Sequence, residues 1–310
     1  MIGGLVGRAG LPSNLVVANP QFLGAYLTSN WGNSTYNSLQ IQVARRFSRG
    51  FSVQSSYTFS RALGEDDGQS STYQANYRTL RNARQDKALL AFHRAGVFKF
   101  NGIYELPFGT GKLIGRNSGP VLDRVIGGWQ LGAIYNNYTG QPLTVTGQNT
   151  INTFTLSSGY TPNLVGALPT TEVTRTPGYV TYFPSLTQVQ TDPARASMTP
   201  ALAALSTLRS ITDAAGKPIL VNAAPGQLGT LPLGVFIGPG INQLDLNVKK
   251  HVRLTERFTL EIGATATNAL NRVQFGNPTT ANLNINSANF GRITTSGNPR
   301  ILVLQGRVNF

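Results

Sequence analysis

The sequence predicts an all-β fold, an antiparallel strand meander that forms a portion of a transmembrane β-barrel. Polar and apolar residues alternate over stretches of about ten residues, short and long connections follow one another in turn, and aromatic residues gather near the ends of these stretches. Membrane-crossing strands have about this length, and they alternate because one face meets lipid and the other the barrel interior. Helical periodicity is almost absent, and no apolar run approaches the roughly 20 residues of a spanning helix.

Seven stretches alternate in this way. They are 36–47, 51–60, 94–104, 128–139, 242–252, 258–267 and 302–310. Along the sixth stretch, Leu260 and Ile262 fall on one face, whereas Glu261 and Thr265 fall on the other. An eighth strand is expected if part of 21–30 also pairs. The chain should therefore supply about seven to eight meander strands of a larger barrel.

The chain divides near residue 32 into two regions. Residues 1–32 are expected to form an N-terminal loop or partial strand, which we interpret as a truncation point. Residues 33–310 should form the C-terminal barrel segment. Its long loops are expected at 62–92, 140–240 and 270–298.

When the strands are placed side by side in chain order, the long loops and the short connections fall on opposite rims of the sheet. The long loops all fall on one rim, whereas the short links 48–50 and 253–257 and the connection 105–127 fall on the other. Outer-membrane barrels have this arrangement, with the long loops extracellular. A soluble β-sandwich gives no reason for it.

Aromatic side chains are expected to form belts where the strands leave the membrane. The belt residues expected at these interfaces are Tyr57, Phe59, Trp129, Tyr135 and Phe258. The chain also ends on an aromatic residue, Phe310, in line with the apolar face of the last strand. Packing in a soluble core would explain buried rings but not this terminal position.

The residues that would carry chemistry are few. The chain has no Cys, and its two His residues, His93 and His251, stand in no metal-binding motif. The carboxylates of 65–67 lie in a Gly-bracketed loop without a nearby His, which favours a solvated or cation-collecting loop over general acid–base catalysis. The sequence therefore predicts no catalytic residue, no metal, no cofactor and no enzymatic activity.

The net charge of +14 is compatible with several anionic partners. Nucleic acid is one of them, but the basic residues gather at predicted strand ends and loops, where phospholipid headgroups and lipopolysaccharide would meet them. We therefore expect outer-membrane lipid and lipopolysaccharide as partners, and no nucleic acid.

Several motifs in fixed order resemble those of TonB-dependent receptors, most closely the Oar-like branch with a carboxypeptidase-regulatory-like domain. They are NSTYNSLQ at 33–40, YELPFGTGK at 104–112, GGWQL at 127–131, TGQPL at 139–143, NALNRVQFG at 268–276 and FGRI at 290–293. The resemblance covers 33–310, and it implies a barrel of about 22 strands with an N-terminal plug and a TonB box. Neither plug nor box is found in this sequence, so the chain resembles the C-terminal third of such a receptor.

Candidate functional residues follow from their expected placement. Solute contacts are expected from loop residues Asp66, Asp67, Arg78, Arg81, Tyr179 and Tyr182, and from wall residues Gln130, Glu261 and Arg307. The resemblance further implies that Phe310 is the signal read by the barrel-assembly machinery, and that the intact receptor works with its plug domain and with TonB.

The expected function is that of an outer-membrane TonB-dependent receptor, or transporter, for uptake of an unidentified solute. One alternative is a passive outer-membrane pore or structural barrel, or a non-functional truncated remnant. Another is a secreted all-β binding protein with 141–240 as its binding loop. Seven or eight strands alone would leave open sheet edges, which are costly in lipid, so such a piece should be a marginal open sheet or should need partner strands.

Overall fold

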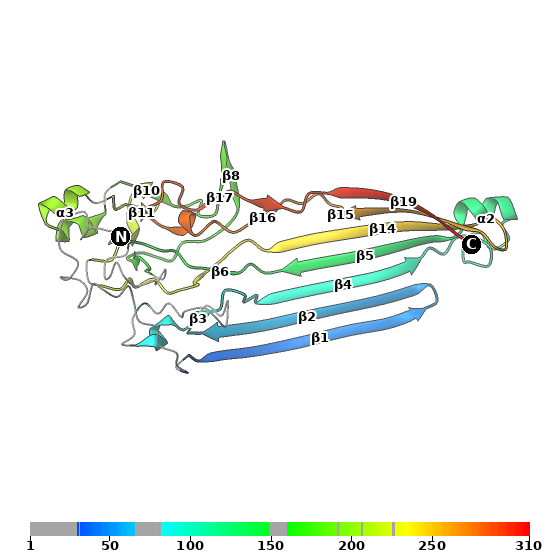
Figure 1. Cartoon of the computed structure of the whole chain (residues 1–310), viewed down its shortest axis with the longest axis horizontal. Coiled ribbons are helices and arrows are strands. Elements are labelled where there is room, and N and C mark those ends of the chain that lie inside the picture. The colour runs from blue at the N-terminus through cyan, green and yellow to red at the C-terminus, as the bar shows by residue number, and fades with distance from the viewer. Residues whose placement is uncertain are drawn as a thin grey trace, which may run out of the picture.

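A computed structural model of the chain describes residues 30, 32–65, 78, 82–148, 160–190, 192–205, 207–224 and 227–310. One antiparallel sheet of long strands runs along most of the molecule (Figure 1). In order across the sheet, its strands are β1 (Ser34–Ser48), β2 (Phe51–Gly64), β4 (Gly96–Glu105), β5 (Trp129–Tyr138), β14 (Ile241–Arg253), β15 (Thr259–Thr267) and β19 (Ile301–Asn309). The short β3 (Ala88–Leu89) pairs with the end of β2. All seven predicted strands are confirmed, and consecutive members of these seven pair with one another.

The remaining elements are short and belong to the connections. They are η2 (Ala83–Asp86), α2 (Pro120–Ile126), β6 (Pro142–Leu143), β7 (Asn163–Leu164), β8 (Thr174–Thr176), β9 (Tyr179–Thr181), β10 (Thr187–Val189), η3 (Pro193–Ser197), α3 (Pro200–Leu205), β11 (Ser210–Thr212), β12 (Pro218–Val221), β13 (Phe236–Ile237), β16 (Gln274–Phe275), η4 (Ala281–Leu283), β17 (Arg292–Ile293) and β18 (Ser296–Gly297). Among the described residues, no helix is long and apolar enough to cross a membrane.

The register gives the sheet one apolar and one polar face. Leu246 pairs with Ala266, which pairs with Leu302, whereas Asn247 pairs with Thr265 one position along the same strands. Side chains of successive residues point to opposite faces, so the apolar rows share one face across the whole sheet. This face carries most of the exposed large hydrophobic side chains of the strands. We call it the outward face, and the opposite one the polar face.

The two rims of the sheet differ as the sequence predicts. At the turn rim, β1 and β2 are joined by Arg49 and Gly50, whose φ values of 55° and 77° are those of a tight hairpin turn. Most of the short strands and helices belong to the connections at the loop rim, and they lie together at one end of the molecule in Figure 1. α2 and the C terminus lie at the other end.

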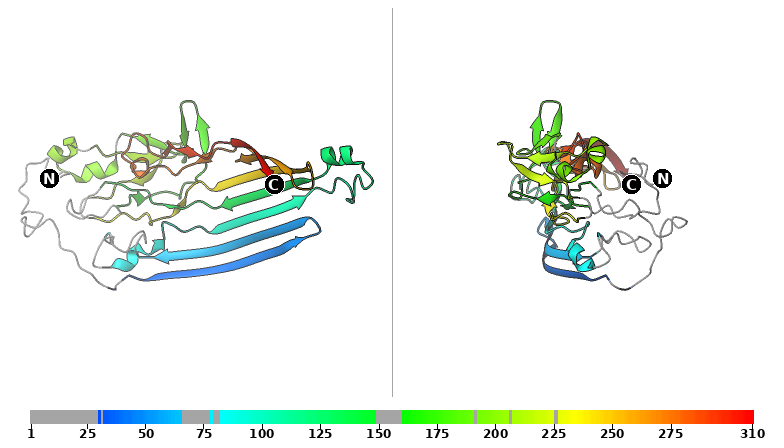
Figure 2. Two further views of the ribbon diagram at one scale, coloured as in Figure 1. Left: turned by 45° about the vertical axis from the view of Figure 1, so that its right-hand side comes forward. Right: turned by 90° about the vertical axis from the view of Figure 1, so that its left-hand side faces the viewer.

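The described sheet is open. β1 and β19 are its two end strands, and they are not paired with each other. Two further views show the strands as a curved wall that does not close on itself (Figure 2). The expected open sheet is confirmed for the described residues.

The buried apolar core of the described residues lies in the loops and not in the sheet. We call the packed described residues of 139–240 and 268–300 the loop unit. Its core is formed by Leu143, Val145, Tyr182, Phe183, Ile211, Ile219, Leu220, Leu231, Phe236, Leu283, Ile285 and Ile293. The apolar residues of the strands face outward and cannot serve as this core, so the loops bury their own apolar side chains against one another.

Candidate functional site: the polar face and the loop unit

The polar face carries a cluster of charges near the turn rim. Glu261 on β15 is paired in register with His251 on β14 and with Arg307 on β19. Lys249 Nζ lies 2.9 Å from Glu261 Oε1, and His251 Nδ1 lies 3.7 Å from Glu261 Oε2. One carboxylate thus stands among three groups that are, or can become, cationic.

Gln130 extends this polar row. It is paired in register with Lys249 on one side and with Glu105 on the other. The register therefore places all three wall residues predicted to contact solute, Gln130, Glu261 and Arg307, on the polar face. Their contact with a solute remains a prediction.

A second polar node lies on the same face toward the loop rim. Gln243 Nε2 donates to Asp245 Oδ1 at 2.9 Å, and the Asn268 amide donates to the same carboxylate oxygen at 2.8 Å. Asn298 Nδ2 in turn donates to Gln243 Oε1 at 3.0 Å. The node fastens the loop unit to the wall. Sequence reasoning did not single out Asp245, although it belongs to the polar row of its alternating stretch.

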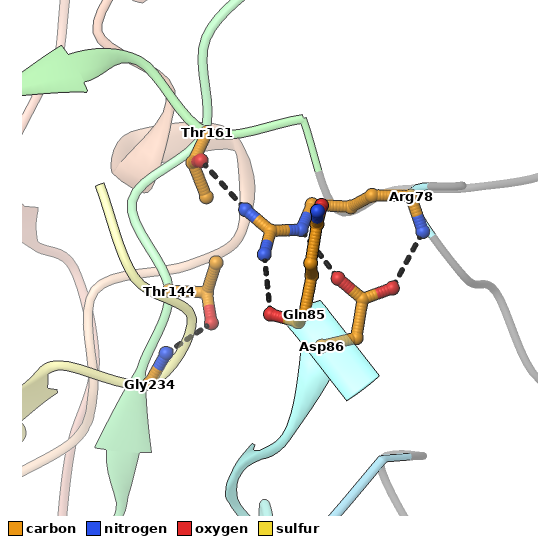
Figure 3. A network of polar contacts seen from close by, with 6 residues as sticks. All are labelled: Arg78, Gln85, Asp86, Thr144, Thr161 and Gly234. Atoms are coloured by element: carbon orange, nitrogen blue, oxygen red, sulfur yellow. Dashed lines mark hydrogen bonds and ion pairs between the residues drawn. The ribbon is translucent and has the colours of Figure 1, made fainter. Parts of the chain in front are cut away.

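Arg78 joins two long loops (Figure 3). Its Nε lies 2.5 Å from Asp86 Oδ1, and its backbone amide donates to Asp86 Oδ2 at 2.7 Å. Its Nη1 donates to Thr161 Oγ1 at 3.2 Å, and its Nη2 donates to the Gln85 carbonyl at 2.8 Å. The Arg78 and Asp86 side chains are only 8% and 3% exposed. In this structure Arg78 thus ties η2 to the loop unit, and its contact with a solute remains a prediction.

The loop unit contains a buried polar network centred on Asn222. Its backbone amide and Nδ2 donate to Asp192 Oδ2 at 2.8 and 2.9 Å. Its Oδ1 accepts from Asn286 Nδ2 at 2.8 Å and from the Gln148 amide at 2.7 Å. Asn222 is 1% exposed. Buried polar groups are costly unless they are bonded, so this network fixes how segments far apart in sequence pack together. Nothing in the local sequence pattern indicates it.

The two tyrosines predicted to contact solute lie in different surroundings. Tyr179 is exposed on a side hairpin, with the Arg292 guanidinium 4.3 Å from its ring centre. Tyr182 is buried in the core of the loop unit, and its hydroxyl donates to the Ile237 carbonyl. Burial raises the pKa of Tyr182, and a hydrogen bond with Thr171 partly opposes this rise. The structure thus places Tyr179 where a solute can reach it and gives Tyr182 a packing role.

Three of the candidate loop residues, Asp66, Asp67 and Arg81, lie outside the described residues, as does nearly all of 1–32. Within the described part of the chain, no group of three or more His, Cys, Asp or Glu side chains could hold a metal ion.

The aromatic residues of the outward face form two belts. The belt near the turn rim consists of Phe51, Tyr104, Trp129, Phe258 and Phe310, and the belt nearer the loop rim consists of Tyr57, Phe59, Phe98, Phe100 and Tyr135. Along β2, Phe51 and Phe59 are separated by about 26 Å of strand. This is comparable to the roughly 25 Å apolar band of outer-membrane barrels.

A strand meander with one apolar face, one polar face and aromatic belts is the construction of an outer-membrane β-barrel. A comparison with protein-family models matches residues 5–303 to the outer membrane beta barrel domain. The chain therefore belongs to the outer-membrane β-barrel family, and its location is the outer membrane. No curated protein and no solved structure matches the chain.

Proposed function

We propose that this chain is the C-terminal barrel portion of a TonB-dependent receptor that takes up a solute across the outer membrane. The observation that carries the proposal is the joining of a charged polar face to a folded loop unit with its own core. A cap of this kind offers a shaped, rigid binding surface above the wall, as selective uptake requires. The motif order that resembles TonB-dependent receptors supports the same function.

The polar face supplies a path for a polar or charged solute. The Lys249, Glu261 and Arg307 groups alternate in sign across neighbouring strands, so they can exchange their mutual contacts for contacts with a passing solute. Tyr179 and Arg292 at the loop rim add an aromatic face and a cation that are suited to a first contact.

The proposal is tested by uptake in cells that carry or lack the gene. The probes are a radiolabelled ferric siderophore, cobalamin, an oligosaccharide and a peptide, each with and without a protonophore that collapses the inner-membrane proton gradient. We expect uptake of one probe to require both the gene and the gradient. Gene-dependent uptake that survives the protonophore would instead identify a passive pore, and gene-independent uptake of every probe would contradict both functions.

The wall residues are tested with the same transported probe. Glu261→Gln and Arg307→Gln should each lower uptake, because they change the charge pattern of the polar face. Glu256→Gln is the matched control, since Glu256 is an exposed acidic residue on the turn between β14 and β15. Uptake at the wild-type level by all three variants would show that the charged cluster does not contact the solute.

A further inference from the structure

The connection between β4 and β5 is a folded unit on the turn rim. In this segment, 106–128, the Gly109 amide donates to the Ile114 carbonyl at 2.8 Å, and the Ile114 amide donates to the Pro107 carbonyl at 2.9 Å. The Thr110 amide donates to Asp123 Oδ1 at 2.5 Å, which joins the first turn to α2. This bond lowers the pKa of Asp123, so the carboxylate stays charged and bonded at neutral pH. We call this segment the rim helix unit.

The rim helix unit is fastened to the outward side of the sheet. Trp129 Nε1 donates to the Val125 carbonyl at 3.2 Å, and Lys250 Nζ donates to the Val125 and Gly127 carbonyls at 2.8 and 2.7 Å. Trp129 and Lys250 are partners in register, and Lys250 is also paired with Ile262, which belongs to the apolar rows. Both side chains that hold the end of α2 therefore belong to the lipid-facing side.

Lys250 is a cation in an otherwise apolar row. Its ammonium lies 4.6 Å from the Trp129 ring centre and bonds carbonyls at the C-terminal end of α2, where a positive charge is favoured. This is how a long basic side chain reaches polar groups from a lipid-facing position. The arrangement gives the rim helix unit a fixed place at the edge of the apolar band.

The rim helix unit exposes large apolar side chains without a protein partner in the described structure. The most exposed are Leu113 at 86%, Val121 at 77% and Val125 at 63%, and Leu122 and Ile114 are more than half exposed. The same segment carries the exposed Arg116 and Arg124, while Lys112 Nζ lies 3.1 Å from Glu105 Oε2 and the one acidic residue of the segment, Asp123, accepts a hydrogen bond from the Thr110 amide. Exposed apolar residues beside an excess of basic residues are characteristic of segments that lie in a membrane interface.

A hollow in the outward face continues this surface into the membrane. It has a volume of about 260 Å³ and lies over the small residues Gly102 and Ala133, which are paired in register. Its walls include Phe51, Tyr104, Leu131 and Val248. Leu131 and Val248 are two residues along their strands from Trp129 and Lys250, so the hollow begins about 7 Å below the rim helix unit.

We propose that the rim helix unit is an interfacial anchor that lies among phospholipid headgroups of the inner leaflet of the outer membrane. An anionic phospholipid is its occupant: Arg116 and Arg124 meet the phosphate, Val121, Leu122 and Val125 meet the upper acyl chains, and the hollow below takes one chain. The leaflet follows from the short-turn rim, which in outer-membrane barrels is periplasmic. The inference depends on the outer-membrane location and not on TonB-driven uptake.

The test is made with the full chain inserted into vesicles of phosphatidylethanolamine and phosphatidylglycerol. The chain has no cysteine, so Leu122→Cys and Val121→Cys each give one site for an environment-sensitive fluorophore. Glu256→Cys, on the neighbouring turn of the same rim, is the matched control. We expect blue-shifted emission and quenching by brominated acyl chains at residues 121 and 122, and quenching by aqueous iodide at residue 256.

Two results overturn the proposal. Water-like emission at both 121 and 122 would place the helix outside the interface. Blue-shifted emission without quenching by brominated chains would mean that protein covers the helix instead of lipid. The charge contribution is tested with Arg116→Gln combined with Arg124→Gln, which should remove the difference in quenching between phosphatidylglycerol-containing vesicles and neutral phosphatidylcholine vesicles.

Discussion

At the scale of single residues, the Arg78–Asp86 pair shows how one buried contact holds a loop. Asp86→Asn leaves the buried Arg78 guanidinium without its carboxylate, and removing one partner of a buried pair costs about 3–5 kcal/mol. We expect the loop unit to lose about this much protection in native-state hydrogen exchange, read at the Asn222 amide. Glu105→Gln is the control, because the exposed Glu105–Lys112 pair is worth under about 1 kcal/mol. Equal losses in the two variants would show that Asp86 has no special role.

His93 makes the junction of β2 with the following loop sensitive to pH. It is 4% exposed, and its Nδ1 accepts a hydrogen bond from the Ala62 amide at 3.2 Å. Burial, and to a lesser extent the nearby Arg61, lowers the pKa of His93. The folded state therefore favours neutral His93, and stability falls as the pH drops below about 6.5, where the unfolded chain binds the proton first.

This pH effect is measured at one amide. Hydrogen-exchange protection of Ala62, corrected for the intrinsic exchange rate, should fall between about pH 7.5 and about pH 5.5. His93→Gln should abolish that fall, whereas His251→Gln, on the exposed polar face, should leave it intact. A pH dependence that survives in His93→Gln would assign it to another group.

At the scale of elements, the same substitution should cost different amounts of stability on the two faces of one strand. Leu304 is on the outward face of β19, paired with Ala264, while Val303 is on the polar face, paired with Thr265. Leu304→Arg should cost about 2–4 kcal/mol in urea unfolding from phospholipid vesicles, since the charge meets hydrocarbon. Val303→Arg should cost much less because its side chain reaches the polar side. Similar costs would contradict the assignment of faces.

The strands could be predicted from sequence because period-two alternation is a local signal, and a strand that separates lipid from water displays it over its whole length. The loop unit could not be predicted in this way. Its core joins Val145 to the distant Ile285, and the Asn222 network joins residues more than sixty positions apart. Such contacts leave no period in the sequence. The local alternation also predicts the face that carries the wall residues Gln130, Glu261 and Arg307, whereas the burial of Tyr182 depends on contacts with segments distant in sequence.

At the scale of the whole molecule, Phe310 bears on assembly. Its side chain is 97% exposed at the end of the outward row, in the same belt as Phe258. If Phe310 is an assembly signal, its deletion should lower the amount of chain in the outer membrane, measured by fractionation. The Phe310→Trp variant, which keeps an aromatic ring at this position, should reach the wild-type amount. Phe258→Ala, which removes a ring from the same belt, should have a smaller effect. Equal losses for the two positions would leave Phe310 an ordinary interface anchor.

The open sheet constrains how the barrel is completed. Neighbouring strands run antiparallel, so with seven strands in the sheet β1 and β19 run in the same direction. Joining them directly would create a parallel seam, whereas bacterial outer-membrane barrels are antiparallel and have even strand numbers. Leaving both edges bare in hydrocarbon costs several kcal/mol for each unpaired backbone group. We therefore predict that at least one further strand lies between β1 and β19 in the assembled protein.

Cysteine pairs test this prediction in the membrane-inserted chain. Thr265→Cys with Val303→Cys should form a disulfide readily under mild oxidation, because these positions are paired in register on neighbouring strands. Gln42→Cys with Gln305→Cys, on the polar faces of the two edge strands, should not form one within a single chain. A strand between β1 and β19 would separate them by about 10 Å instead of the roughly 5 Å between paired strands. Efficient intramolecular disulfide formation between residues 42 and 305 would mean that β1 and β19 pair directly in parallel, and it would contradict the predicted intervening strand.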